Sequence, residues 1–217
     1  MTEPAPPDQP TDLSPLTLNR LSVYLRCLRR LEGEGKVTIS SADLARRFHL
    51  SATLIRKDLA QFGELGIRGV GYDIVKLRAR LETILGVDRE HRAVIVGAGN
   101  LGSALARFPG FNRGAFRIAA LVDNDPAKAG QVIGAFTVRP SAELADVVHE
   151  HHIELGILAV PPEAAQDNYD ALADTGILAV LNFAPAHIVE RTGVPIKTVD
   201  FLIFLEELAY LLRGNES

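Results

Sequence analysis

The spacing of hydrophobic residues predicts a helix near the start of the chain. From Leu16 to Leu31, leucines recur every three or four residues, and Gly33 and Gly35 follow, so an amphipathic helix should end there. A short strand-prone stretch, Lys36–Ile39, comes next. Residues 1–15 carry five prolines and several acidic residues, and we expect them to form a disordered tail.

Two shorter helices are predicted after this, with a tight turn between them. Ser40 precedes Asp43 by three residues, the spacing of a capping box. Ser51 is a second candidate N-cap, for a helix that runs to about Phe62. Two short helices joined in this way are typical of a helix-turn-helix. The residues of the second helix expected to face inward are Leu54, Ile55, Leu59 and Phe62.

Glycines dominate the next segment. Gly63–Tyr72 has four glycines within nine residues, with β-branched and aromatic residues between them, which predicts a small hairpin. A hairpin directly after a recognition helix is the wing of a winged helix. Ile74–Leu85 has apolar residues on one side and predicts a linking helix. We therefore place a winged-helix DNA-binding domain at residues 16–85.

The second part of the chain alternates short apolar strands with helices. The predicted strands are Ala93–Val96, Ile118–Val122, Phe136–Val138, Leu155–Val160 and Leu178–Asn182. Helices are predicted from about Leu101, over Ala142–Glu150 and over Glu163–Asp174. Such alternation predicts a parallel sheet covered on both faces. The predicted fold class is α/β, with a Rossmann-type domain at residues 86–198.

The last predicted element, Phe201–Leu212, is apolar on almost every side, and only Glu206 and Glu207 suit water. A helix that is hydrophobic all round must be buried. The chain's own core is one place for it. We favour a partner subunit, because this is the last element of a small protein, and we assign residues 199–217 to dimerisation.

The distribution of charge agrees with this division. The formal net charge of −4 is unfavourable for binding DNA, but Leu16–Arg92 holds 15 Lys and Arg against 9 Asp and Glu, whereas Ala93–Ser217 holds 8 against 15. We therefore expect only the first part to meet a polyanion. The single cysteine, Cys27, excludes an internal disulfide and fits a reducing cytoplasm. No apolar run reaches the roughly 18 residues of a membrane-spanning helix.

The segment Gly97-Ala98-Gly99-Asn100-Leu101-Gly102 is a GxGxxG motif between a predicted strand and a predicted helix, and Asp123 follows 21 residues after its last glycine. In this context the glycines let the pyrophosphate of a dinucleotide approach the amides of a helix start. The Asp123 carboxylate would accept hydrogen bonds from the adenosine ribose and repel a 2′-phosphate, which favours NAD(H) over NADP(H). The alternative is a turn whose glycines serve packing, with Asp123 as a helix cap.

Basic side chains cluster on the predicted helix-turn-helix and wing. Arg56 and Lys57 lie on the recognition helix opposite its apolar face, where they would meet the major groove or its phosphates. Arg68 stands among the wing glycines, a position suited to a minor groove. The candidate DNA-binding residues are Arg46, Arg47, Ser51, Thr53, Arg56, Lys57, Arg68 and Gly69. The alternative is a set of solvated surface charges.

The sequence shows no catalytic or metal-binding pattern. His149, His151 and His152 are close together, but their position suits a helix C-terminus, and a zinc site would need a further ligand. No Ser-His-Asp or Cys-His pattern stands out. We therefore expect neither enzyme activity nor a bound metal.

The order of several motifs resembles one family, Rex, the bacterial redox-sensing transcriptional repressors. The resemblance runs from about Thr17 to Leu212. It implies a repressor that binds palindromic operator DNA when NAD⁺ dominates and releases it when NADH binds. It also implies a homodimer whose C-terminal helices are exchanged between subunits. The matching stretches are Ile55–Leu59, Phe62-Gly63, Arg68–Tyr72, Gly97–Leu105, Asn182–Pro185 and Val199–Phe201.

The resemblance also implies roles for single residues. Phe201 would enter the partner's nicotinamide pocket. Asp200 and Arg26 would belong to a polar switch between the cofactor site and the DNA-binding domain. Phe108 stands where some family members have a tyrosine, so the switch would lack a hydroxyl hydrogen bond here. Besides the glycine loop and Asp123, the expected cofactor contacts are Asn124, Val160, Pro161 and Phe201.

Two other interpretations remain open at this point. One is an NAD-dependent dehydrogenase, against which the chain after Ala93 leaves room only for the nucleotide domain and a final helix. The other is a regulator that senses coenzyme A or another nucleotide. Asp123 speaks against coenzyme A, because a carboxylate suits a free ribose better than a phosphorylated one.

Overall fold

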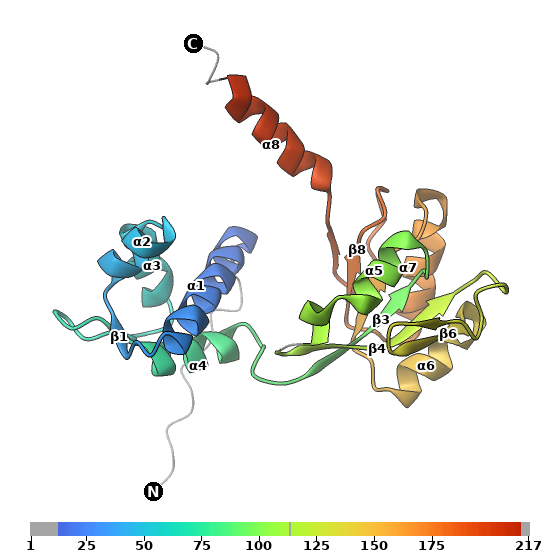
Figure 1. Ribbon diagram of the computed structural model, residues 1–217, viewed down its shortest axis with the longest axis horizontal. Coiled ribbons are helices and arrows are strands. Elements are labelled where there is room, and N and C mark those ends of the chain that lie inside the picture. Colours follow the sequence, from blue (N-terminus) through green and yellow to red (C-terminus); the bar gives the residue numbers. More distant parts are fainter. Residues whose placement is uncertain (1–12, 113, 214–217) are drawn as a thin grey trace, which may run out of the picture. The chain divides into compact units, whose positions relative to one another are not determined.

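The computed structural model describes residues 13–112 and 114–213, and the chain divides into two units, Met1–Arg89 and Glu90–Ser217 (Figure 1). Residues 1–12 of the expected tail lie outside the described part of the chain. The rest of that tail differs from expectation, because the first helix, α1 (Pro15–Gly33), already includes Pro15. Proline suits the first helical turn, where its missing N–H has no partner to lose, and the Ser14 hydroxyl accepts the Thr17 N–H at 3.2 Å.

Helices α2 (Ser41–Phe48) and α3 (Ala52–Ala60) begin at the two expected caps. The side chains of Ser40 and Ser51 each accept a hydrogen bond from the backbone N–H three residues later, at 3.0 and 3.3 Å. His49 adopts the left-handed conformation, with φ of 55°, and turns the chain between the two helices. The pair has the compact form of a helix-turn-helix.

The core of the first unit lies between α1, α2, α3 and α4 (Ile74–Ile84). Ile55 and Leu59 of α3 are buried there, as expected, but Leu54 is 41% exposed. Its expected inward orientation is wrong, because residues of one helix follow each other at 100° and the stripe led by Ile55 already faces α1.

The predicted wing forms with a different pairing. Within it only one bridge occurs in the described residues, Ile67 with Gly71. Strand β2 (Tyr72–Asp73) pairs antiparallel with β1 (Thr38–Ile39) instead. The wing is therefore a loop tied at its base to the strand that precedes α2, with Arg68 near its tip.

The described strands of the second unit form one seven-stranded sheet in the order β5-β6-β4-β3-β7-β8-β9. All neighbours are parallel except β5 and β6. Without β5, this is the strand order of the Rossmann fold, which binds dinucleotides where the order reverses. The strands are β3 (His91–Val96), β4 (Phe116–Asp123), β5 (Val132–Ile133), β6 (Phe136–Pro140), β7 (Leu155–Leu158), β8 (Ala179–Asn182) and β9 (Ile196–Thr198).

Helices cover both faces of this sheet. Alternate residues of β3 face opposite cores: Ala93 and Ile95 pack with α5, and Val94 and Val96 pack with α6 and α7. This explains why β3 has a continuous apolar run rather than an alternating one. The helical segments are α5 (Asn100–Arg107), η1 (Pro109–Asn112), η2 (Ser141–Glu143), α6 (Leu144–Glu150), η3 (Pro162–Ala164), α7 (Ala165–Asp174) and α8 (Phe201–Arg213).

Strand β9 is absent from the sequence-based prediction. It has three residues, none of them buried, at the edge of the sheet. Such a strand forms because β8 offers it free backbone groups, which no pattern of side chains indicates.

Candidate functional site

The glycine loop lies at the carboxyl end of β3, where the strand order reverses between β4 and β7. The Gly97 N–H donates to the Val122 carbonyl of β4 at 2.8 Å. On the other side, a Cβ added to Gly97 would lie 2.4 Å from the Ala159 carbonyl oxygen and 3.1 Å from Val160. Gly97 also has φ of 104°. Only glycine fits this turn, and the structure brings the loop and Val160 together.

The loop leads directly into the start of α5. Gly99 is the N-cap, and Asn100 and Leu101 open the helix on its exposed side. A Cβ added to Gly99 would meet no atom within 4 Å, so this residue faces open space. A Cβ on Gly102 would lie 1.7 Å from the Gly97 carbonyl oxygen. The helix start therefore presents backbone amides to a space that an anionic group can enter.

Asp123 ends β4 with its carboxylate turned into the glycine loop. The Oδ2 atom accepts the Ala98 N–H at 2.6 Å and the Lys128 ammonium at 3.0 Å, and Oδ1 accepts the Asp125 N–H at 2.8 Å. Burial alone would raise the pKa of Asp123, but these three donors outweigh it and lower that pKa. The role of Asp123 at a cofactor site stays a prediction; the contact with Lys128 was not expected from the sequence, where its only signal is its place in the turn after β4. Asn124, between the two aspartates, is exposed.

A cavity of about 400 Å³ lies at the carboxyl ends of β8 and β9. Phe183, which lines it, donates its N–H to the Leu158 carbonyl of β7 at 2.9 Å, so the cavity starts beside the strand that flanks the glycine loop. The Phe201 ring stacks on the Phe183 ring of the same chain, with centroids 6.3 Å apart. The lining is Phe183, Pro185, Ala186, Thr198, Val199, Asp200, Phe201 and Leu202.

The shape of this cavity depends on Asn182, which is fully buried. Its Oδ1 accepts the Ala184 N–H at 2.8 Å and its Nδ2 donates to the Ala184 carbonyl at 3.0 Å. This side chain substitutes for a backbone partner and fixes the turn after β8. Asp200 accepts the Leu202 N–H at 2.9 Å through Oδ1 at the start of α8.

The remaining residues expected at the cofactor site or the switch occupy separate places. Pro161 is exposed just before η3. Phe108 is 56% exposed and meets the Phe111 ring edge-on, with centroids 5.7 Å apart. Arg26 is exposed on α1 of the first unit.

The exposed side of α3 carries the residues expected to meet DNA. Thr53, Arg56 and Lys57 are exposed there, opposite the buried Ile55. The Arg56 guanidinium donates to the Ser41 hydroxyl at 2.9 Å. Ser51 is exposed too, but its hydroxyl caps α3.

The two arginines of α2 differ in their surroundings. Arg46 forms an exposed ion pair with Asp43 at 3.0 Å. Arg47 pairs with Glu34 and lies over the Phe48 ring, so its guanidinium is directed back onto its own unit. Arg46 is the freer of the two to meet a ligand.

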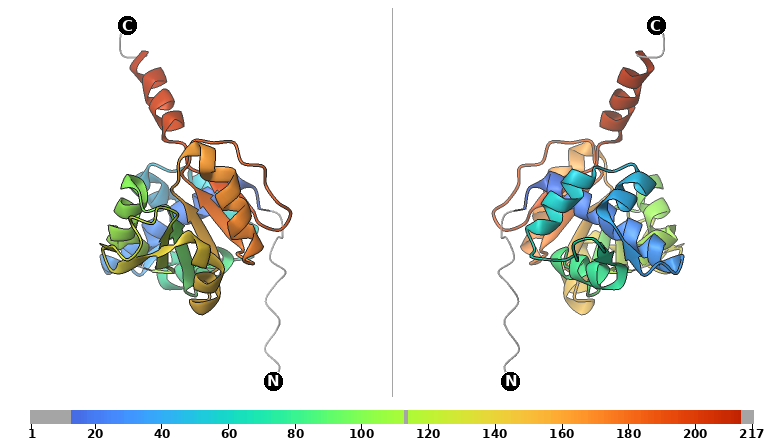
Figure 2. Two further views of the ribbon diagram at one scale, coloured as in Figure 1. Left: turned by 90° about the vertical axis from the view of Figure 1, so that its right-hand side faces the viewer. Right: turned by 90° about the vertical axis from the view of Figure 1, so that its left-hand side faces the viewer.

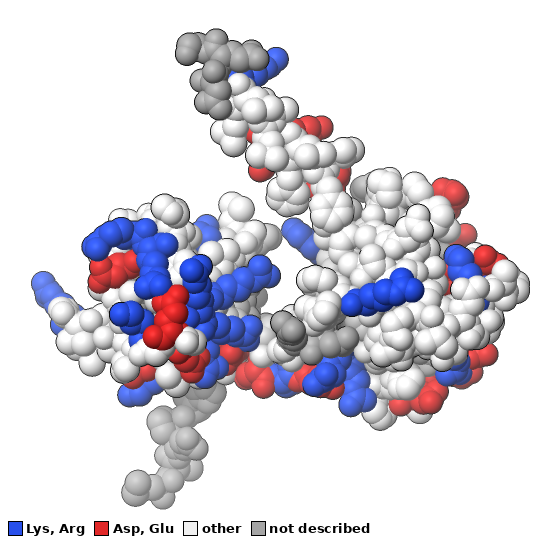
Figure 3. Space-filling view, viewed as in Figure 1, with Lys and Arg blue, Asp and Glu red and all other residues white. Residues whose placement is uncertain are grey.

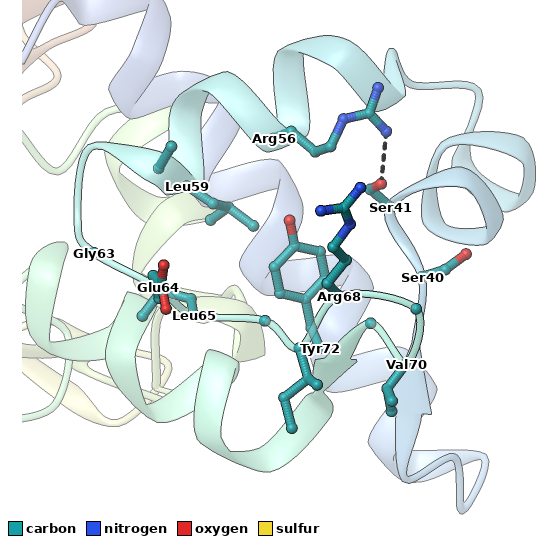
Figure 4. A pocket seen from close by; sticks show the side chains of 15 residues that line it. Ser40, Ser41, Arg56, Leu59, Gly63, Glu64, Leu65, Arg68, Val70 and Tyr72 are labelled. Atoms are coloured by element: carbon teal, nitrogen blue, oxygen red, sulfur yellow. Dashed lines mark hydrogen bonds between the residues drawn. The ribbon is translucent and has the colours of Figure 1, made fainter.

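A hollow of about 550 Å³ separates α3 from the wing. Figure 4 shows Arg68 of the wing pointing toward the Arg56–Ser41 pair, with the Tyr72 ring at the back of the hollow. Burial raises the pKa of Tyr72, and the nearby charge of Arg56 partly opposes the shift. Gly69, next to Arg68, has φ of 82° and bends the tip.

The inner side of α3 is anchored by an ion pair that sequence reasoning missed. Asp58 is 2% exposed, and its two carboxylate oxygens accept the Arg20 Nε–H and Nη2–H at 2.6 and 2.8 Å. The Tyr24 hydroxyl donates to the same carboxylate at 2.9 Å. The Arg20 fork holds the pKa of Asp58 below its usual range, whereas burial and the bond to Asp58 raise the pKa of Tyr24 to about 12. These contacts fix α3 on α1.

Basic side chains are abundant on the surface of the first unit. Figure 3 shows Lys and Arg side chains gathered on the visible face of this unit.

In the described part of the chain, no three His, Cys, Asp or Glu side chains come together as a metal site would require. No helix of that part has both the length and the hydropathy needed to cross a membrane.

Two family models match the chain. One, described as a CoA binding domain, matches residues 88–186, and one described as a putative DNA-binding protein N-terminus matches residues 12–60. The solved structure of RSP, a Rex-family repressor, in complex with beta-NAD⁺ and operator DNA has a TM-score of 0.88 and 32% identity over 95% of each chain. RSP in complex with beta-NADH has a TM-score of 0.85 at the same identity, over 95% of this chain and 97% of that one.

Curated relatives are closer in sequence. The redox-sensing transcriptional repressor Rex of Desulforamulus reducens is 44% identical over 200 residues, which span 92% of this chain and 95% of that protein. The Rex protein of Carboxydothermus hydrogenoformans is 43% identical over 199 residues, 92% and 96% of the two chains. Similarity of this degree over nearly the whole length of both proteins shows that this chain belongs to the Rex family of redox-sensing transcriptional repressors.

Proposed function

We propose that this chain is a transcriptional repressor that senses the NADH/NAD⁺ ratio. It binds palindromic operator DNA when NADH is low and leaves the operator when NADH binds. The observation that carries the proposal is the presence in one chain of an exposed recognition helix (α3) with a wing and of a glycine loop at the switch point of a Rossmann sheet. The named relatives, and RSP with NAD⁺, NADH and operator DNA, support it.

The cofactor site that we propose has two parts. The residues from Gly97 to Gly102, with Asp123 and Asn124, hold the adenosine and the pyrophosphate, which NAD⁺ and NADH share. The cavity beside Phe183 takes the nicotinamide, Val160 and Pro161 contact it there, and Phe201 enters this pocket of the partner subunit. Its lining is mostly apolar, and burying the charged ring of NAD⁺ there costs more than burying the neutral ring of NADH. A tenfold preference for NADH needs only about 1.4 kcal/mol.

The DNA site that we propose is the outer side of α3 with the wing. Arg56, Lys57 and Thr53 approach the major groove, and Arg68 with Gly69 approaches the neighbouring minor groove. Arg46 and Ser51 contact the phosphates at the edges of this surface, and Arg47 does so by exchanging Glu34 for a phosphate. We assign this site to a domain of residues 16–85 and the cofactor site to residues 86–198.

The C-terminal helix supports a homodimer with exchanged helices. No residue of α8 is buried within the chain, and both views of Figure 2 show it standing clear of the sheet. Its apolar side chains, such as Leu205 and Leu208 at 58% and 56% exposure, need a cover. An apolar groove of about 320 Å³ on the face of the sheet that α5 leaves open, with Leu155 and Leu181 in its lining, offers matching surface.

The dimer can be tested by a charge on this helix. We expect the wild-type protein to sediment as a dimer, and Leu208→Glu to sediment as a monomer, because the carboxylate would have to be buried without a partner. Val132→Glu, which puts the same charge on a side chain that is 71% exposed in the second unit, serves as the control and should stay dimeric. A wild-type monomer, or a dimer that survives Leu208→Glu, would contradict the proposal.

We further propose that the protein is a regulator rather than an enzyme and acts in the cytoplasm, where the operator lies. Its relatives are repressors by name. Asp200, Arg26 and Phe108 serve as the switch, with a weaker polar link where Phe108 has no hydroxyl. NADH acts only through its different affinity for the two states of the dimer.

The central test is operator binding at fixed salt while NADH is titrated against an excess of NAD⁺. We expect release of the operator by NADH and retention with NAD⁺. Salt must be constant because phosphate contacts dominate affinity. Binding that is indifferent to NADH would reject the redox-sensing part. The match to a CoA binding domain makes coenzyme A the alternative ligand, and release by coenzyme A alone would favour it.

The variant Arg56→Ala separates the two sites in the same assay. It should lose about 1–3 kcal/mol of operator affinity, the usual value for a base-contacting arginine. Its NADH affinity should equal that of the wild type, because Arg56 belongs to the first unit. Unchanged operator affinity would remove Arg56 from the interface.

A further inference from the structure

The adenosine end of the cofactor site contains a cation that the GxGxxG pattern does not include. Lys128 lies in the turn after β4, and its ammonium is 3.0 Å from Asp123 Oδ2. The Lys128 side chain is 32% exposed, whereas that of Asp123 is 6% exposed. The ammonium is therefore the more accessible partner of the pair.

The hydrogen bonds of Asp123 leave little room for a ribose. A carboxylate offers about four acceptor positions, and the described contacts use three of them: Ala98 N–H and Lys128 on Oδ2, and Asp125 N–H on Oδ1. One position, on Oδ1, remains for a hydroxyl. A ribose has two vicinal hydroxyls, so Asp123 alone cannot bind both of them without giving up a contact that shapes the glycine loop.

The Lys128 ammonium supplies what the carboxylate lacks. It has three N–H donors, and the described contacts use one of them. A free N–H can donate to the oxygen of the second hydroxyl. The ammonium also offsets the charge of Asp123, so the rim of the site is close to neutral rather than anionic.

We propose that Lys128 forms the adenosine ribose subsite together with Asp123 and that the balance of these two charges sets the preference for a free 2′-hydroxyl over a 2′-phosphate. This inference rests on the proposed function. Asp123 repels a 2′-phosphate, as in other sites of this fold, and Lys128 attracts it, since lysine binds phosphate as a point charge. The expected exclusion of NADP(H) by Asp123 is thereby moderated.

The test is a cycle of four proteins: the wild type, Lys128→Met, Asp123→Ala and the double variant. The dissociation constants of NADH and NADPH are measured for each by titration calorimetry. We expect Lys128→Met to raise the ratio Kd(NADPH)/Kd(NADH) at least about tenfold, because a dianionic phosphate loses more than a hydroxyl does. Asp123→Ala should lower the ratio by a similar factor. In the double variant the ratio should return most of the way to the wild-type value.

Two further variants keep the outcome interpretable. Lys76→Met removes the same charge from an exposed position of α4 in the first unit and should leave the ratio unchanged. Lys128→Arg keeps the charge and should stay near the wild-type ratio, which provides a test even if Asp123→Ala does not fold.

The failure of this inference differs from the failure of the proposed function. A wild type that binds NADH, with the same ratio in Lys128→Met, would overturn the role of Lys128 and leave the redox sensor standing. A ratio that falls equally in Asp123→Ala and in the double variant would overturn it too. A folded wild type that binds no NADH would overturn the proposed function, and this inference with it.

Discussion

Replacing Gly102 by alanine is expected to weaken NADH binding at least about a hundredfold, a loss of roughly 2.7 kcal/mol. The added Cβ would lie 1.7 Å from the Gly97 carbonyl oxygen and 3.4 Å from the Ile95 side chain. No real contact is that short, and the first neighbour is backbone, which cannot rotate away. The loop or the start of α5 must therefore move, and the amides would no longer converge on the pyrophosphate.

Gly99→Ala is the matched control for Gly102→Ala. A Cβ there would meet no atom within 4 Å, so Gly99→Ala should unfold at the wild-type temperature and lose only cofactor affinity, because the methyl occupies space meant for the ligand. Gly102→Ala should lose both stability and affinity. Calorimetric titration with NADH and thermal unfolding of the two variants separate these effects. Near-normal NADH affinity in Gly102→Ala would refute the assignment of this loop as the pyrophosphate site.

The second large effect is expected at Asp58. Replacing it by alanine leaves the Arg20 guanidinium without its fork partner and the Tyr24 hydroxyl without its acceptor. Asp58 is buried but its partner Arg20 is 32% exposed, so the loss should be about 2–3 kcal/mol, between the values for exposed and fully buried pairs. A loss of this size is a large part of the stability of a small domain, so the first unit should unfold at a markedly lower denaturant concentration, and operator binding should fall with it. A change of less than 1 kcal/mol would show that the pair contributes little.

The same pair makes stability depend on pH in a defined direction. The pKa of Asp58 is lowered in the folded protein, chiefly by the Arg20 hydrogen bonds. Its stabilising contribution is therefore complete above the unfolded carboxyl value of about 3.9 and is lost as pH falls from there through the lower folded pKa. Unfolding of wild type and Asp58→Ala between pH 7 and pH 3 should show their difference shrinking only at the acid end. Asp43→Asn, at an exposed pair with Arg46, should behave as the wild type.

Local patterns determined much of this protein. Ser40 and Ser51 mark helix starts because a hydroxyl can satisfy amides three residues away within the same segment. The GxGxxG spacing indicated a turn between a strand and a helix, because Gly102 must clear the carbonyl of Gly97 five residues earlier. The apolar helix from Phe201 was visible because no arrangement of its residues gives it a polar face.

The tertiary structure alone decided the contacts between distant segments. Arg20 and Asp58 are 38 residues apart, and no pattern in either segment indicates that the two side chains will pair. Tyr72 pairs with Ile39 rather than within the wing, since free strand edges pair wherever the packing of helices brings them. Lys128 contacts Asp123 only because the turn after β4 folds back onto the end of that strand. The sequence by itself determines most helices and the buried strands, because their patterns depend on neighbours along the chain. An edge strand such as β9, and the charges that meet at the site, depend on packing, and the chemistry of the site depends on it too.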